Sequence, residues 1–435
     1  MSSHTVILGA GIIGVSTAYY LSQHQDPTTI HLVDPSPELF SSASGYAGGF
    51  LGKNWFGTSL APLGALSFEE HRRLAEEHGG KEKWGYSPAT CISYSASAAE
   101  RESQVRGDDW LRDGTSRADA APPVVLDGMS GRTPAWLRRL EGDYVELIGE
   151  EGTTAQLDPL KLCEFLLGEC VRKGVALHHP AKPVAVSTGE KGEVVGLRIR
   201  DCKSGGETEL ACTRVIIAAG SWTGQVFQTL FPRSELQVPI KSLAGHSLVL
   251  KSPRWHAGLE SKGCHGIFMT HEGGFCPEMF SRLRGHIYFA GLNSSTLPLP
   301  DAAKGKAAPN TADLEQLRQA AREILGSGEE GDGDDLEVVR EGLCFRPVTS
   351  WGTPIISRIP DRDLGAGMAT RPGAEGGVYV AAGHGPWGIA MSLGTGMVLA
   401  EMAQGRELSA DVAGLAFDGD RAKGGGYANT PNGRM

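Results

Sequence analysis

The N-terminal segment places the strongest constraint on what this chain folds into. Thr5 to Leu8 form a short run of β-branched and aliphatic residues, which is typical of a buried parallel strand. Gly9, Gly11 and Gly14 follow with the spacing G-x-G-x-x-G, and apolar residues at helical spacing come after them. The first glycine permits a tight turn, the second lets the backbone approach a pyrophosphate, and the third lets the helix pack on the strand. The free N–H groups and the dipole of the helix N-terminus then favour a bound phosphate.

A second β-type run, Ile30 to Val33, ends at Asp34, about 25 residues after the first glycine. An acid at this position is placed to bind the hydroxyl groups of a ribose. Together the two segments predict a dinucleotide site. Two alternatives are a glycine-tolerant turn in another α/β fold and a phosphate site that holds no adenylate. The residues that complete this predicted site are Ile12, Ile13 and Pro35.

Length and charge limit the remaining possibilities. The chain has 435 residues, which exceeds one ordinary core and indicates two domains. Its net charge of −10 argues against general binding to nucleic acids or to anionic membranes. No apolar run reaches transmembrane length, and we interpret the longest, 389–400, as a buried helix. Because the first strand begins almost at Met1, we expect no signal peptide.

The eight cysteines contain no C-x-x-C pair and no zinc-like spacing. This pattern predicts free thiols in a reducing compartment, and we therefore expect a cytoplasmic protein.

Three further segments rich in small residues continue the nucleotide argument. In the loop 40–51, Ser42, Ser44 and Gly48 offer a polar backbone of low bulk, although a flexible linker has a similar composition. An apolar strand ends in Ala219-Gly220, a second turn that permits close approach. Residues 377–382 form a third strand, which enters a glycine-rich loop that opens a long helix. The N-terminus of that helix is suited to stabilise the negative charge of a reduced redox ring.

Five motifs follow one another along the chain: V-I-L-G-A-G-I-I-G, D-P-x-K-L-C, I-I-A-A-G-S-W, C-x-R-P-V-T and A-A-G-H-G-x-W-G-I. In this order they resemble the FAD-dependent amine and amino-acid oxidase family, the group of D-amino-acid oxidase, glycine oxidase and sarcosine oxidase. The resemblance spans nearly the whole chain. It is strongest to a fungal and plant branch with the loop A-S-G-x-A-G-G-F-L, which is 43–51 here.

The resemblance implies an α/β fold with a Rossmann-like FAD-binding domain and a discontinuous, mainly antiparallel β-sheet substrate domain. The FAD-binding domain is expected from residues 1–70, 150–235 and 336–420, and the substrate domain from 71–149 and 236–335. Residues 421–435 lack an apolar pattern, and we expect a disordered tail there.

The resemblance also assigns cofactor contacts. The dinucleotide fingerprint and the weaker contacts are Gly9, Gly11, Gly14, Asp34, Ser44, Gly48, Val184 and Gly220, and the flavin-edge loop is Gly383, His384, Gly385, Pro386, Trp387, Gly388 and Ile389.

In the family, a hydride moves from the carbon next to nitrogen to flavin N5, the imine is hydrolysed, and oxygen or another acceptor reoxidises the flavin. Arg346 matches the arginine that binds a substrate carboxylate, a task suited to a planar guanidinium, although a structural salt bridge is the alternative. Cys344 matches the cysteine that bonds the flavin in sarcosine oxidase-like members, and it fits equally the role of a small buried residue.

No general base is identifiable, and hydride transfer from a neutral amine needs none. His384 and Lys53 are the remaining catalytic candidates, His384 as a base and Lys53 as the positive charge that speeds oxygen reduction. A hydrogen-bonded loop histidine and a surface lysine are the alternatives. His246 is a weaker candidate for the base, and Lys241 is a weaker candidate for the positive charge. Arg282 and Arg284 are weaker candidates for recognition of a carboxylate.

The leading function is therefore the oxidation of a small-molecule amine or amino acid by FAD, with oxygen as the expected acceptor. Three alternatives remain: a dehydrogenase with a different acceptor, a non-catalytic flavoprotein scaffold, and a tailoring oxidase of a larger metabolite. The last rests on a substrate mouth formed by Trp351 and Trp387.

Overall fold

A computed structural model describes residues 4–95, 117, 121, 134–138, 143–150, 152–271, 275–326 and 335–417. The tail predicted for 421–435 lies outside these residues.

The predicted N-terminal strand is the centre of a six-stranded sheet. Its four residues are buried, and they pair in parallel with a strand on each side, for example Val6 with Val215 and with His31. This burial on both faces explains the uninterrupted apolar run. In order across the sheet, the strands are β17 (Ile355–Ile359), β18 (Gly377–Ala382), β11 (Arg214–Ile217), β1 (Thr5–Leu8), β2 (Ile30–Val33) and β7 (Ala176–His178).

A nine-stranded sheet forms the second layer of the fold. All of its pairings are antiparallel except the one between β13 and β4. Its strands are β16 (Glu337–Val348), β12 (Lys241–Lys251), β15 (His286–Ser294), β14 (Glu278–Arg282), β13 (Cys264–Thr270), β4 (Ser87–Ser95), β6 (Thr154–Gln156) and β3 (Phe50–Gly52), with β5 (Tyr144–Gly149) beside β4. A third sheet has three strands, β10 (Glu207–Ala211), β9 (Val194–Asp201) and β8 (Ala181–Thr188).

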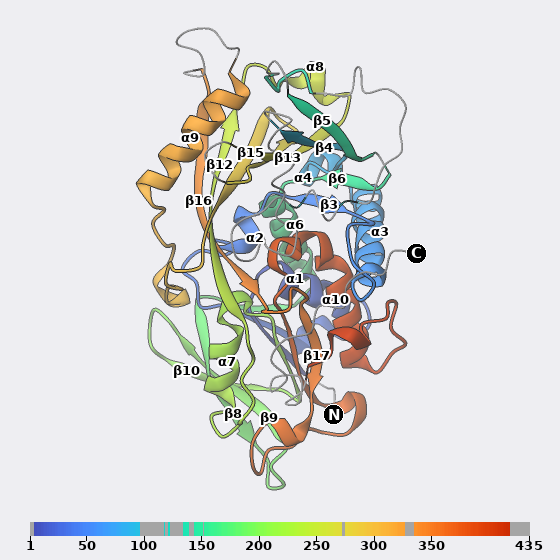
Figure 1. Cartoon of the computed structure of the whole chain (residues 1–435). Coiled ribbons are helices and arrows are strands. Elements are labelled where there is room, and N and C mark those ends of the chain that lie inside the picture. The colour runs from blue at the N-terminus through green and yellow to red at the C-terminus, as the bar shows by residue number, and fades with distance from the viewer. Residues whose placement is uncertain are drawn as a thin grey trace.

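The long antiparallel partners β12 and β16 run from the end of the molecule that carries α9 to its middle (Figure 1). They therefore bring the large sheet close to the six-stranded sheet. The α-helices are α1 (Ile12–Leu21), α2 (Ala43–Tyr46), α3 (Ala61–His78), α4 (Gly80–Trp84), α6 (Pro159–Lys173), α7 (Thr223–Leu230), α8 (Ala257–Glu260), α9 (Thr311–Leu325) and α10 (Gly388–Gln404).

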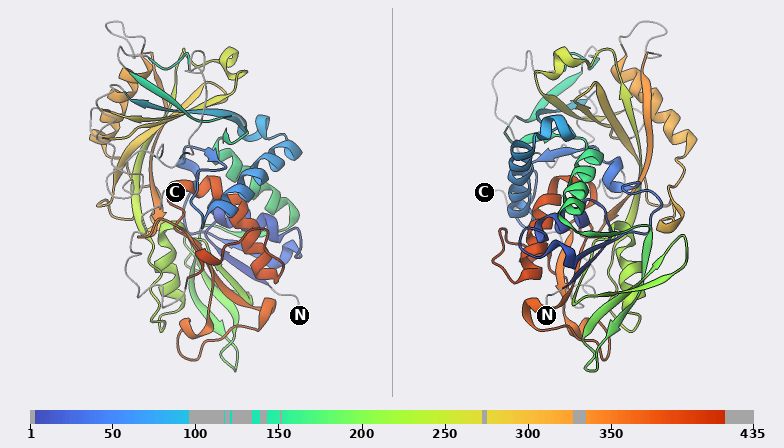
Figure 2. Two further views of the ribbon diagram at one scale, coloured as in Figure 1. Left: turned by 45° about the vertical axis from the view of Figure 1, so that its right-hand side comes forward. Right: turned by 180° about the vertical axis from the view of Figure 1, so that it is seen from behind.

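The first and last of these helices pack against each other, and α1, α3, α6 and α10 lie together as one group (Figure 2). A Cβ at Gly396 of α10 would lie 2.6 Å from the backbone carbon of Ser16 in α1, so the two helices approach as closely as glycine permits. The segment 389–400 lies within α10 and is buried, as predicted, except for the half-buried Met397. No helix in the described part of the chain is both long and apolar enough to cross a membrane.

The predicted combination of a Rossmann-like sheet, here parallel except for the edge pair of β17 and β18, and a mainly antiparallel sheet is confirmed. All eight cysteines are free thiols, as expected. Strand pairing departs from the predicted segment boundaries. β3, β6 and β16 belong to the nine-stranded sheet, although they fall in segments 1–70, 150–235 and 336–420. The division into two domains, with the bounds given above, stays a proposal.

Candidate functional site

One cavity of about 660 Å³ connects the two glycine-rich helix openings. Gly9, Gly11, Ile12 and Ile13 line one part of it, and residues 384–386, 388 and 389 line another. Its size lies within the range of about 300–1,000 Å³ that is typical of ligand pockets. Residues from opposite ends of the chain therefore face a single elongated space.

The turn between β1 and α1 has the geometry that its glycines predict. Gly9 has a φ of +105°, which a residue with a side chain rarely adopts. The N–H of Ile12, the first residue of α1, donates to Ser44 Oγ at 2.9 Å. The first four N–H groups of a helix have no partner within the helix, so the remaining ones are free to bind an anion.

Asp34 joins this turn to the end of β2. Its Oδ2 accepts a hydrogen bond from the N–H of Ala10 at 2.9 Å, and its Oδ1 accepts one from the N–H of Ser36 at the same distance. Asp34 and Pro35 both line the cavity. The carboxylate thus fixes the turn while it borders the space where we expect a ribose.

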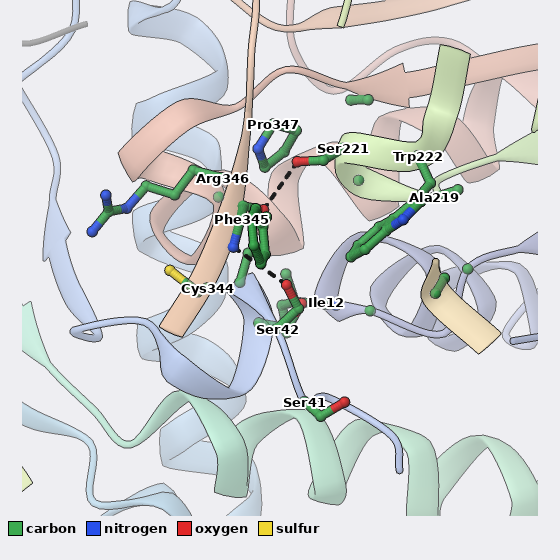
Figure 3. A pocket seen from close by; sticks show the side chains of 18 of the residues that line it. Ile12, Ser41, Ser42, Ala219, Ser221, Trp222, Cys344, Phe345, Arg346 and Pro347 are labelled. Carbon is green, nitrogen blue, oxygen red and sulfur yellow. Dashed lines mark hydrogen bonds between the residues drawn. The ribbon is translucent and has the colours of Figure 1, made fainter. Parts of the chain in front are cut away.

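The small-residue loop and the Ala219-Gly220 turn hold β16 from two sides (Figure 3). Ser221 Oγ donates to the carbonyl of Phe345 at 3.0 Å, and the N–H of Phe345 donates to Ser42 Oγ at 3.4 Å. Side chains alternate along a strand, so Cys344 and Arg346 point to the side opposite Phe345 (Figure 3). All three line the cavity, as do Ser42, Ser44, Gly48, Ala219 and Gly220.

Arg346 is a half-buried cation that forms no ion pair within the described part of the chain, although the carboxylate of Glu278 is a charged neighbour. Its guanidinium donates to Asn293 Oδ1, and Tyr288 is a second polar neighbour. Burial alone lowers the pKa of Arg346, but neighbours that include Cys344 and Tyr288 outweigh it and hold that pKa above its usual value. A Cβ at Gly245 would lie 2.4 Å from Nη1, so this glycine of β12 makes room for the guanidinium.

The second helix opening lies beside these residues. The turn η9 (Gly385–Trp387) leads directly into α10, and His384 precedes it. The Nε2 of His384 lies 3.2 Å from Thr395 Oγ1, and burial lowers the pKa of this histidine to about 4. His384 is therefore neutral at pH 7, and its partner Thr395 ties the loop to helix α10.

The buried histidines give a testable dependence of stability on pH. Burial lowers the pKa of His71 and His384 to about 4, whereas an unfolded histidine titrates near 6.5. Between these values the unfolded chain binds more protons, so the free energy of unfolding falls as the pH drops from about 6.5 towards 4. We expect the Tm at pH 5 to be lower than at pH 7.

The substitution His384→Asn should reduce this loss of Tm, whereas His24→Asn, at an exposed position, should leave it unchanged. Thermal unfolding at both pH values measures the effect. An equal loss in His384→Asn and in the unsubstituted protein would contradict the burial argument for this residue.

The structure does not bring all predicted residues to the cavity. Lys53 pairs with Glu69 at 2.6 Å at a partly exposed position outside the cavity lining. Val184 does not line the cavity because it lies at a bulge of β8, and its neighbours Lys182 and Pro183 do so instead. Gly14 and Gly383 are also absent from the lining. A Cβ at Gly14 would lie 1.9 Å from the carbonyl oxygen of Gly9, which fits its predicted packing role.

The predicted tryptophan mouth is not present at this cavity, since neither residue lines it. Trp387 packs into an aromatic cluster with Phe50, Trp55 and Phe56. Trp351 stacks on Phe417. Both rings therefore contribute to packing.

The weaker candidates also have structural partners. The buried Arg282 donates to the carbonyls of Ala47 and Gly48. Arg284 donates to a backbone carbonyl at the surface. His246 accepts the N–H of Asn310 and lies 3.4 Å from Asp313, and Lys241 is exposed and lies outside the cavity lining. None of the four faces the cavity as a free group.

Sequence reasoning missed several polar residues that line the cavity, among them Arg117, Glu278, Tyr288 and Asn293. Arg117 forms a bidentate ion pair with Glu278, at 2.6 and 2.7 Å, and lies over the ring of Trp387. Tyr288 and Asn293 of β15 accompany Arg346. Glu278, Tyr288 and Asn293 could have been found only by a prediction of how β14 and β15 pair. The sequence carries no signal that points to Arg117.

The residues present fit a flavin dinucleotide. The first glycines of the fingerprint leave the backbone uncovered, and a Cβ at Gly11 would enter the space in front of Ser44 Oγ, at 3.0 Å. The free amides of α1 suit a diphosphate, and those of α10 suit the electron-rich edge of a flavin ring. The cavity between them is continuous.

Comparisons with known proteins agree with this geometry. The family model described as "FAD dependent oxidoreductase" matches residues 4–402. A Schizosaccharomyces pombe protein provisionally named oxidoreductase C1F5.03c is 27% identical, over 92% of this chain and 94% of the relative. Glycine oxidase from Geobacillus kaustophilus has a similar fold, with a TM-score of 0.67, 18% identity, and 95% and 98% of the two chains covered. L-amino acid deaminase from Proteus vulgaris gives a TM-score of 0.70 at 12% identity, with 95% and 96% covered. The match over nearly the whole chain means that this protein belongs to the FAD dependent oxidoreductase family.

Proposed function

We propose that this chain oxidises the C–N bond of an amine that carries a carboxylate. Such a substrate is an amino acid or an N-substituted amino acid. The observation that supports this substrate class best is Arg346, a half-buried guanidinium that faces the cavity, donates to the neutral amide of Asn293 and has no ion-pair partner among the described residues. The nearby carboxylate of Glu278 is already paired with Arg117, so a carboxylate of the substrate would supply the ion-pair partner that Arg346 lacks. The fold is shared with proteins named glycine oxidase and L-amino acid deaminase, which is consistent with the proposal.

The residues around Arg346 are suited to orient such a substrate. Asn293 fixes one edge of the guanidinium, and Gly245 leaves its face uncovered by a side chain. When bound, FAD supplies the hydride acceptor at N5. The N-terminus of α10 lies at the same cavity and would stabilise negative charge there. His384 is neutral and buried, so the proposed reaction uses no histidine base and starts from the neutral amine.

The direct test is an anaerobic screen in which amino acids and amines are mixed with the FAD-loaded protein. Bleaching of the flavin absorbance by amino acids, but not by the matching amines without a carboxylate, would support the proposal. Equal bleaching by both would show that the carboxylate is not recognised. Bound FAD that no compound reduces would favour the non-catalytic scaffold.

Oxygen is the acceptor that we propose for the second half of the reaction. Oxygen consumption with release of peroxide during turnover would support it. Bleaching without reoxidation by oxygen would instead indicate a dehydrogenase with a quinone or protein acceptor. A tailoring oxidase of a larger metabolite stays an alternative, but Trp351 and Trp387 do not support it, because neither lines the cavity. A cytoplasmic location stays a prediction, consistent with eight free thiols.

Covalent attachment of FAD through Cys344 is a further prediction. Cys344 is buried, lines the cavity and points to the same side of β16 as Arg346 (Figure 3). If the bond forms, acid precipitation of the purified protein leaves the yellow colour in the pellet, and Cys344→Ser moves it to the supernatant. Cys276, the other cysteine of the cavity lining, provides the matched control as Cys276→Ser. Colour in the supernatant of the unsubstituted protein would exclude the bond.

A further inference from the structure

The connection between β15 and α9 lies across the cavity. Residues 299–303 and 305–307 of this connection line the cavity, and we call residues 299–307 the strap. By sequence the strap falls in the segment 236–335, which we expected to bind substrate and not cofactor. The strap includes the short turn η6 (Ala302–Lys304), and Asp301 caps it by accepting the N–H of Ala303 at 3.0 Å.

The strap is fastened to the nucleotide-binding side of the cavity at two places. The indole Nε1 of Trp222 donates to the carbonyl of Pro300 at 2.7 Å. Lys306 Nζ forms an ion pair with Glu38 Oε2, also at 2.7 Å. Trp222 closes the Ala219-Gly220 turn, and Glu38 follows shortly after Asp34. The strap therefore crosses from one wall of the dinucleotide region to the other.

The two ends of the strap are fastened to the large sheet. Leu299 and Ala307, together with the preceding Leu297, pack on a buried cluster that includes Leu343 and Phe345 of β16. Beyond the strap, the N–H of Asn310 donates to His246 Nε2 at 3.1 Å. A chain segment held at both ends and twice in between leaves this side of the cavity only when several contacts break.

We propose that the strap is the outer wall of the FAD site and limits the rate at which FAD leaves. The ligand that it covers is the diphosphate-bearing half of the dinucleotide, because Pro35, Ser36 and Lys182 line the same cavity. Lys306 and Lys182 add positive charge on this side. Release of FAD then requires breakage of the contact between Trp222 and Pro300 and of the ion pair between Lys306 and Glu38. The proposal rests on the family cofactor and not on the proposed substrate.

The test measures FAD release in a Cys344→Ser background, so that a covalent bond cannot hold the cofactor. The double variant Trp222→Phe/Lys306→Met removes the indole donor and the ion pair but keeps the bulk. The matched control is Lys304→Met, which removes the same charge from an exposed strap residue that does not line the cavity. The rise of free-FAD fluorescence after dilution gives the rate. We expect release to be about tenfold faster in the double variant, and within about twofold of the parent in the control.

Hydrogen exchange provides a second measurement that needs no strap variant. In the Cys344→Ser parent, bound FAD should slow amide exchange in residues 299–307 relative to the apoprotein. If the double variant fails to fold, this comparison alone decides. Equal release rates in the double variant and the control, or exchange in the strap that FAD does not change, would overturn the proposal.

Discussion

Replacing Arg346 by glutamine is expected to raise the KM for an amino-acid substrate by about 30-fold or more. Truncating one partner of a buried, charge-assisted pair costs about 2–5 kcal/mol, which corresponds to a factor of about 30 to several thousand. The substrate for this measurement is the amino acid that bleaches the flavin fastest in the anaerobic screen. Arg346→Lys keeps the charge but loses the planar bidentate geometry, so we expect it to recover only part of the loss.

The companion substitution Gly245→Ala tests the position of the guanidinium without removing it. The new Cβ would lie 2.4 Å from Nη1, and the end of a long side chain can move away. We therefore expect the fold and the FAD content to be preserved while the KM rises, by less than in Arg346→Gln. A carboxamide analogue of the substrate serves as the internal control, because it lacks the anion and should bind equally to all variants. An unchanged KM in Arg346→Gln would mean that this arginine is structural.

The two glycine-rich openings could be predicted from the sequence because their geometry is a local demand of the backbone. The φ of +105° at Gly9 requires a residue without a Cβ, and the spacing of the next two glycines follows from a strand that enters a helix. The order of the segments along the chain then predicts the Rossmann-like sheet that β1 and β2 belong to. Such features leave a mark within a few residues of the chain, whatever the rest of the sequence does.

The polar residues around the substrate end could not be predicted in this way. Arg117 and Glu278 are separated by 161 positions, and only the assembled sheets bring them together. The prediction for Lys53 rests on its positive charge alone, but Glu69, 16 positions later, pairs with it. Trp387 was assigned by its place in a motif, yet its ring turns to the aromatic cluster. The charge or the aromatic character of a residue does not predict which side chain it contacts in the folded protein.

The substitution Gly14→Ala should destabilise the protein and abolish retention of FAD. The added Cβ would lie 1.9 Å from the carbonyl oxygen of Gly9. That oxygen belongs to the backbone of the turn, so the start of α1 has to move, and its N–H groups leave the position in which they face a phosphate. Overpacking of this kind costs about 1–3 kcal/mol of stability. Thermal unfolding and the ratio of flavin to protein absorbance after purification measure both effects.

Gly168→Ala is the matched control, because it adds the same methyl group to a glycine of the neighbouring helix α6. A Cβ there would have no atom within 4 Å, and alanine in a helix interior is more favourable than glycine by about 0.5–1 kcal/mol. We therefore expect a slightly higher Tm and a full complement of FAD. A lower Tm in Gly14→Ala and a higher Tm in Gly168→Ala would show that the loss of stability comes from the contact between α1 and the turn, and not from the added methyl group itself. If Gly14→Ala keeps its flavin, the β1–α1 turn does not position the cofactor as its glycine spacing implies.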